Sequence, residues 1–226
     1  MFTLKAFYKV DVPFFFENWF YWIWAVFAGS FVFISGIVCR YSANNIKRGA
    51  QCFLLGMVLT FVTALAAPPV AILFGILHFL GICMLLFGLG EELFDFIPPY
   101  VGLIVSVVLL AFTWNVPNGY LGTGSISFEL PQLLYKAKLL FPLGFKGAGF
   151  SSGDYFPMLP WVFLFFAGVY FGIFVKEGDC PRFFYATRIP LLAAVGRYTI
   201  WIYLFHQPLA ILILFFILGK PDFNYK

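Results

Sequence analysis

The sequence predicts an all-α membrane protein, a polytopic bundle of about six transmembrane helices with one long extracytoplasmic loop. Of the 226 residues, 62% are hydrophobic and 11% are charged, whereas a soluble domain has about 45–50% apolar and about 25% charged residues. Aromatic residues make up 23% of the chain, more than one aqueous core buries. The apolar runs are continuous instead of alternating, which favours helices over a barrel. Soluble and disordered classes are therefore excluded.

Six apolar segments approach the length of about 20 residues that a transmembrane helix needs. They are residues 19–39, 50–67, 70–89, 100–114, 157–175 and 191–218. Residues 115–156 form the one long connection, and a connection of that length is usually functional. Within it, Leu133 to Phe145 is apolar but carries two lysines, which predicts an interfacial or re-entrant helix. The pattern contains no repeat, so we expect a single domain over residues 1–226.

Basic residues gather in the connections after the first and fifth segments, which lie on the same side in a six-span alternation. They are Arg40, Lys47 and Arg48 in the first connection and Lys176, Arg182 and Arg188 in the second. The positive-inside rule predicts that both are cytoplasmic, which leaves the chain ends and residues 115–156 outside. We expect a multi-pass protein of the bacterial inner membrane. The net charge of +4 is too small to predict binding of nucleic acid.

The only two histidines of the chain, His78 and His206, lie inside predicted spans. Ionisable residues are expensive in a bilayer and mark functional sites by default. At 1.5 Å per residue, His78 is about 18 Å from Gly90 and His206 about 14 Å from Arg197, so both fall near the membrane middle. Two imidazoles at this depth indicate a general base or nucleophile in a shared cavity. The alternative is a pair of structural hydrogen bonds between helices.

Further polar residues surround these positions. Tyr203 and Gln207 are near His206, where Tyr203 either orients the imidazole or packs. Arg188 and Arg197 either anchor the topology at the cytoplasmic side or hold a phosphate. Asp154 precedes the fifth span, where it either caps that helix or contacts a substrate. Two isolated histidines without a third ligand do not predict a metal site.

Four segments in the same order resemble one family, the bacterial proteins related to the catalytic domain of heparan-alpha-glucosaminide N-acetyltransferase. The resemblance extends from about Phe14 to Pro208. The segments that carry it are Phe31–Ile37, Phe74–Gly81, Ser152–Trp161 and Gly196–Pro208. The family usually has an additional first helix, and we expect that this chain lacks it.

The resemblance implies an acyltransferase that takes an acyl group, typically acetyl, from cytoplasmic acyl-CoA. It implies transfer of that group to a sugar amine or hydroxyl on the far side, with the lipid bilayer, acetyl-CoA and a saccharide acceptor as partners. Four of the candidate residues match family motifs: His78, Asp154, Arg197 and His206. The site residues that we expect are His78 and His206 for catalysis, Arg197 and Arg188 for the coenzyme, and Asp154, Tyr203 and Gln207 for the acceptor.

Two other functions fit the same pattern of residues. A membrane transporter or channel would use the two intramembrane histidines to relay protons or to bind a solute. The absence of internal repeats and of paired broken helices argues against this function. The third possibility is an inactive, truncated member of the family, which the absence of the first helix would explain.

Overall fold

The computed structural model describes residues 18–66, 68, 71–124, 126–147, 149–182, 185, 194–196 and 198–218. Contacts divide the chain into two units, one formed by Trp22–Asp179 and one formed by the two ends of the chain. The described residues are mostly helical, which confirms the helical character that the sequence predicts. The second unit contains one described long helix, α10 (Thr199–Leu218).

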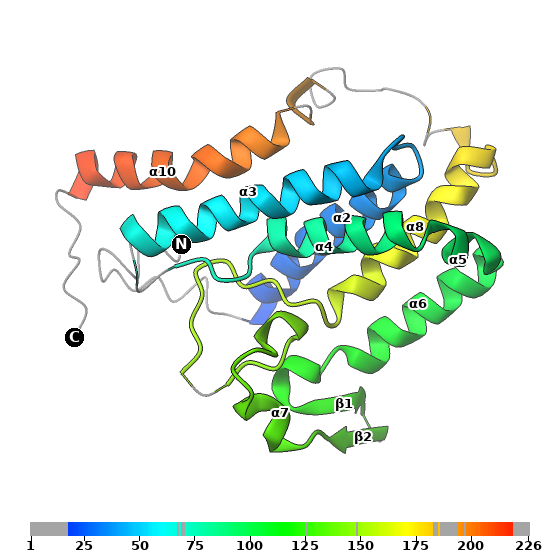
Figure 1. The fold of residues 1–226 in the computed structure, drawn as a ribbon, viewed down its shortest axis with the longest axis horizontal. Helices are drawn as coiled ribbons and strands as arrows, with labels where there is room; N and C mark the ends of the chain where they lie inside the picture. Colours follow the sequence, from blue (N-terminus) through cyan, green and yellow to red (C-terminus); the bar gives the residue numbers. More distant parts are fainter. Residues whose placement is uncertain are drawn as a thin grey trace. The chain divides into compact units, whose positions relative to one another are not determined.

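The unit formed by Trp22–Asp179 is a bundle of helices. Its long helices are α2 (Asn18–Cys39), α3 (Asn45–Ala66), α4 (Ile76–Leu89), α6 (Pro99–Thr113) and α8 (Trp161–Glu177), with the short α5 (Glu91–Phe96) after α4. Figure 1 shows α3 and α4 lying side by side, and α6 and α8 form a second contacting pair. The core is aromatic, because Phe79, Phe87, Phe156 and Phe165 are fully buried.

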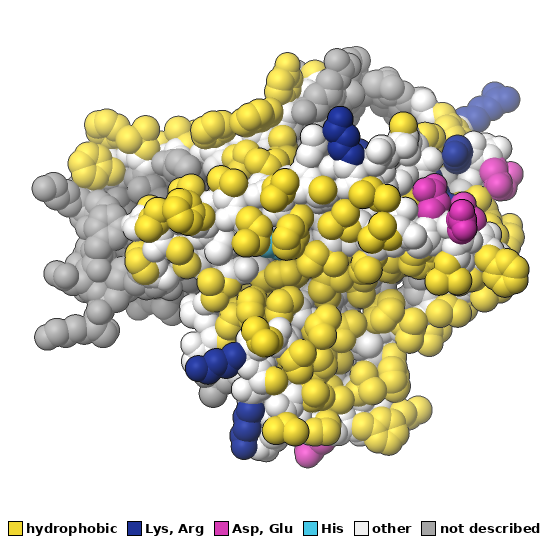
Figure 2. All heavy atoms as spheres, in the orientation of Figure 1, with side chains coloured by type: hydrophobic (Ala, Val, Ile, Leu, Met, Phe, Trp, Pro, Cys, Tyr) yellow, Lys and Arg dark blue, Asp and Glu magenta, His cyan; other side chains and the backbone are white. Residues whose placement is uncertain are grey.

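The surface of the bundle is apolar. Within the described residues, three helical segments are long and apolar enough to cross a bilayer, namely Trp22–Cys39, Asn45–Ala66 and Pro99–Asn118. Large hydrophobic side chains along them are exposed, among them Phe27, Leu54 and Phe61. Figure 2 shows hydrophobic side chains across the middle of one face, with most of the charged side chains toward its margins. Such a surface is stable in contact with lipid, so the chain is a membrane protein.

Two glycines let α2 and α8 approach closely. A Cβ atom built on Gly36 would lie 2.1 Å from the carbonyl oxygen of Phe165, and one built on Gly168 would lie 2.1 Å from that of Phe33. The contact is reciprocal, because each glycine faces the backbone of the other helix. Small residues at such crossings are typical of membrane helices, whose association depends on close packing.

Substituting alanine for Gly168 is expected to destabilise the bundle, because α2 and α8 must then separate. Overpacking costs about 1–3 kcal/mol, occasionally more, and the thermal unfolding midpoint in detergent measures the loss. Gly196→Ala is the control, since a Cβ atom there meets no atom within 4 Å. Equal midpoints for the two variants would show that the close approach does not matter for stability.

Several helix boundaries differ from those read from hydropathy. Helix α3 begins at Asn45, five residues before the predicted span, because the Asn44 side chain accepts a hydrogen bond from the Lys47 amide at 2.7 Å and so caps the helix. Helix α8 begins at Trp161 instead of Pro157. Helix α4 begins at Ile76, so the first part of the predicted span 70–89 is not helical.

The long connection is ordered into short elements. A β-hairpin pairs β1 (Tyr120–Thr123) with β2 (Ile126–Glu129). The region expected to form an interfacial or re-entrant helix contains only α7 (Gln132–Lys136) and the 3-10 turn Phe141–Leu143. Pro131 and Pro142 stand at the starts of these pieces, and proline cannot donate the backbone hydrogen bond that one continuous helix would require at residue 142.

Candidate functional site

The candidate site lies where α4 begins, beside a buried segment that is not helical. Residues 71–75 lie outside any helix, although Ala71, Ile72, Phe74 and Gly75 are buried, so most of their backbone groups need partners from other segments. Helix α3 supplies two of the missing partners: the Thr60 hydroxyl donates to the Ile72 carbonyl at 2.6 Å, and the Ile72 amide donates to Thr63 Oγ1 at 3.0 Å. Irregular backbone at membrane depth is tolerated only where protein groups satisfy it in this way.

Residues 152–156, before α8, supply the other partners of this segment. The Leu73 amide donates to Ser152 Oγ at 3.0 Å. The Gly153 amide donates to the Ala71 carbonyl at 3.2 Å, and the Phe156 amide donates to the Phe74 carbonyl at 3.0 Å. The break in the span is therefore held on one side by α3 and on the other by a segment about 80 residues later in the chain.

His78 lies in the first turn of α4 and is 2% exposed. Its Nδ1 atom accepts a hydrogen bond from the Gly75 amide at 3.2 Å. Its Nε2 atom lies 3.3 Å from Thr60 Oγ1. Because the Thr60 hydroxyl hydrogen goes to the Ile72 carbonyl, the network assigns the ring proton to Nε2 and leaves the lone pair on Nδ1.

The His78 ring is held between aromatic and backbone surfaces. The Phe74 ring stacks on it with centroids 5.6 Å apart, and the Phe53 ring contacts it edge-on at the same distance. A Cβ atom on Gly56 would lie 2.9 Å from Nδ1, so only glycine leaves room for the imidazole there. Gly56 is about 17 Å along α3 from Asn45, which places His78 beside the middle of that helix.

Asp154 lies beside His78. Its Oδ2 atom accepts a hydrogen bond from the Ile76 amide at 3.2 Å, so the carboxylate caps α4, where a negative charge is stabilised by the helix dipole. It does not cap α8, whose N-cap residue is Pro160. His78 and Asp154 thus bind the consecutive amides of Gly75 and Ile76. The structure therefore brings together two of the residues selected from the sequence.

The remaining sequence-predicted residues lie on α10 or outside the described residues. His206 is exposed within its unit, its Nδ1 atom lies 2.5 Å from the Tyr203 carbonyl oxygen, and the rings of these two residues are 5.6 Å apart. Tyr203 therefore shares a helix face with His206. Arg188, Arg197 and the side chain of Gln207 lie outside the described residues. A cavity shared by the two histidines stays a prediction.

Arg40 is a buried cation that the sequence indicated only as a topological anchor. Its side chain is 8% exposed and pairs with Asp95. Its Nε atom donates to the Val169 carbonyl at 3.1 Å, and its guanidinium lies 4.9 Å from the centre of the Phe87 ring. The ion pair puts the connections after α2 and α4 at the same end of the bundle. The connection after α2 is basic and the connection after α4 is acidic. This opposite charge is the sequence signal that could have identified the pair.

Within the part of the chain that the structure describes, no group of three or more His, Cys, Asp or Glu side chains is placed to hold a metal ion. The arrangement at α4 instead offers one imidazole lone pair, one carboxylate and several backbone amides. That set is suited to accepting a proton and to stabilising the charge that results.

A family model matches residues 1–208, and its description is heparan-alpha-glucosaminide N-acetyltransferase, catalytic. No curated protein and no solved structure matches the chain. The match includes α2 to α8, His78 and Asp154, and it ends within α10, two residues after His206. The chain belongs to the heparan-alpha-glucosaminide N-acetyltransferase catalytic family.

Proposed function

We propose that this protein is an integral membrane acyltransferase that moves an acetyl group from cytoplasmic acetyl-CoA to a sugar amine or hydroxyl outside the cytoplasm. Membership of an acetyltransferase family supports the reaction class. The main support for the position of the active site is that His78 and Asp154 bind consecutive backbone amides at the break before α4. Buried ionisable groups at such a break are costly, which favours a functional role.

His78 acts as the general base in this proposal. Its Nδ1 lone pair takes the proton of the acceptor amine or hydroxyl once the long hydrogen bond from the Gly75 amide opens. The acceptor nitrogen or oxygen then forms a bond to the acetyl carbon, and the bond to the coenzyme A sulfur breaks, so the thiolate leaves. Asp154 stabilises the imidazolium that forms, as carboxylates beside catalytic histidines do.

The other roles follow the predicted topology. Six spans, formed by α2, α3, α4, α6, α8 and α10, would place the Arg40 end in the cytoplasm of a bacterial cell. Arg188 and Arg197 would bind the coenzyme phosphates, since guanidinium groups bind phosphate in a bidentate manner. Asp154, Tyr203 and Gln207 would contact the acceptor, with His206 as a second catalytic group. This arrangement separates the donor and the acceptor across the membrane.

The test is acetyl transfer across the membrane of proteoliposomes that contain the purified protein. With labelled acetyl-CoA on one side and an amino sugar on the other, we expect labelled sugar to accumulate only when the protein is present. Free coenzyme A is also expected to raise the unfolding temperature, because a ligand at 100 times its Kd adds about 2.7 kcal/mol of stability. Pantetheine, which lacks the nucleotide phosphates, is the control and should have a smaller effect.

Two results would contradict the proposal. One is the absence of labelled sugar from vesicles in which the protein is folded. The other is flux of solute through the vesicles without any thioester, together with no effect of coenzyme A on unfolding, which would indicate a transporter.

A further inference from the structure

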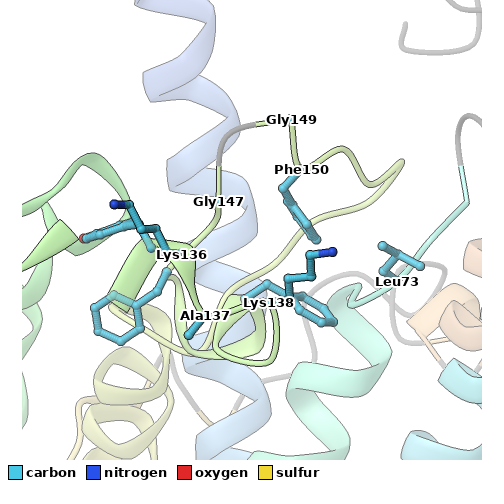
Figure 3. A pocket seen from close by; sticks show the side chains of 10 residues that line it. Leu73, Lys136, Ala137, Lys138, Gly147, Gly149 and Phe150 are labelled. Atoms are coloured by element: carbon cyan, nitrogen blue, oxygen red, sulfur yellow. The ribbon is translucent and has the colours of Figure 1, made fainter. Parts of the chain in front are cut away.

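A cavity of about 500 Å³ lies next to the candidate site. Its walls come from α7, from the turn that follows it and from the loop residues Phe145, Gly147, Gly149 and Phe150, with Leu73 of the non-helical segment on the other side. Figure 3 shows these residues around the opening. Aromatic rings form much of the lining, namely Phe141, Phe145, Phe150 and Tyr135.

The walls of the cavity are fixed to the core. The Phe141 ring contacts Phe74 edge-on with centroids 6.4 Å apart, and Phe74 is the ring that stacks on His78. The Tyr155 hydroxyl donates to the Phe141 carbonyl at 2.6 Å, and the Tyr155 ring packs against Phe150 at 5.0 Å. Burial raises the pKa of Tyr155, so its hydroxyl stays a neutral donor and brings no negative charge to the wall.

The charge of the cavity is positive. Among the described residues that line it, Lys136 and Lys138 are charged and none is a carboxylate. Figure 3 shows the Lys138 side chain extending between Phe150 and Leu73, whereas the Lys136 side chain points to the opposite side. One ammonium group therefore projects into a space with apolar walls, an arrangement that selects a ligand with both an anionic group and an apolar part.

The cavity lies on a segment that is suited to the membrane interface. Leu133 is 76% exposed and Leu139 is 87% exposed, and these leucines flank the two lysines in the sequence. Exposed leucines with lysines between them place apolar side chains at the acyl boundary and ammonium groups at the headgroups. A ligand that reaches this opening from the bilayer presents a headgroup and the start of its acyl chains together.

We propose that the cavity binds an anionic phospholipid, with its phosphate on the Lys138 ammonium and the upper part of a chain against Phe150 and Leu73. A free phosphate ester has the same anionic group but leaves the aromatic walls without a partner. The lining therefore favours a phospholipid over a free phosphate ester as the ligand. The proposal does not depend on acyl transfer. It adds a lipid site on the face that the proposed function assigns to the acceptor.

The experiment measures bound lipid by native mass spectrometry on protein purified with equal amounts of phosphatidylglycerol and phosphatidylcholine. We expect wild-type protein to retain phosphatidylglycerol. Lys138→Gln is expected to reduce its binding about tenfold, because a hydrogen bond to a charged group is lost. Lys146→Gln is the matched control, because Lys146 is exposed in the same loop but does not line the cavity, and it should stay within about twofold of wild type. Phe150→Ala should also reduce retention, because it removes an apolar wall.

Three outcomes would overturn the proposal. Equal losses for Lys138→Gln and Lys146→Gln would show that net charge alone attracts the lipid. Displacement of the lipid by soluble glycerol phosphate at equal concentration would assign the site to a free phosphate ester. Unchanged retention in a correctly folded Lys138→Gln protein would exclude this cavity. Because the assay contains no thioester, its result is independent of whether the protein transfers acetyl groups.

Discussion

Replacing His78 by glutamine is expected to reduce acetyl transfer by at least about 100-fold while leaving the fold intact. Loss of a general base costs about 10²–10⁴-fold in rate. Glutamine at the third position of a helix still accepts the hydrogen bond of the N-cap amide, so it replaces the bond that His78 accepts from Gly75. The variant therefore removes the base and keeps the cap. Steady-state transfer in proteoliposomes gives the rates.

Two further variants separate catalysis from structure. His78→Ala removes both the base and the cap, so it should lower the unfolding temperature as well as the rate. His206→Ala tests the second histidine, which the structure places on an exposed face of α10. Full transfer by a folded His78→Gln protein would assign His78 a purely structural role. The pH dependence of the transfer rate is a second readout. It should differ between the wild-type protein and His78→Gln only if the imidazole accepts the proton during the reaction.

Removing the Asp95 carboxylate is expected to have the largest effect on stability. Asp95→Ala leaves the Arg40 guanidinium buried without its anion, since the Arg40 side chain is only 8% exposed. Breaking a buried ion pair from one side costs about 3–5 kcal/mol. We expect a value near the lower end, about 3 kcal/mol, because Asp95 itself is 51% exposed and solvent already screens the pair.

A double-mutant cycle provides the control. Arg40→Met keeps most of the side-chain volume against Phe87 and removes the buried charge, so Arg40→Met with Asp95→Ala should be more stable than Asp95→Ala alone. Unfolding in detergent by denaturant gives the four free energies of the cycle. If the two single effects simply add, the two side chains do not interact energetically.

The sequence was sufficient to predict the helices, because long apolar runs in α2, α3 and α6 allow no other structure in a bilayer. It was also sufficient to select His78 and Asp154, because polar groups are scarce in and around the spans. Their placement on the consecutive amides of Gly75 and Ile76 was not predictable. It depends on the break at residues 71–75, where hydropathy is continuous and where the partners Thr60 and Ser152 belong to distant segments. Likewise, the sequence placed Lys138 in an interfacial segment but did not predict that it lines a cavity, because the cavity forms only when the loop folds.

The non-helical segment also sets an order of assembly. Because a chain is synthesised from its N-terminus, residues 71–75 are made before residues 152–156, and until those follow, the Leu73 amide and the Phe74 carbonyl lack their final partners. Unsatisfied backbone groups are not stable in lipid, so this stretch must enter as part of a helix or stay at the interface. The start of α4, with His78, therefore reaches its final geometry only after the segment before α8 has arrived. The candidate site is completed late, by the part of the chain that also carries Asp154.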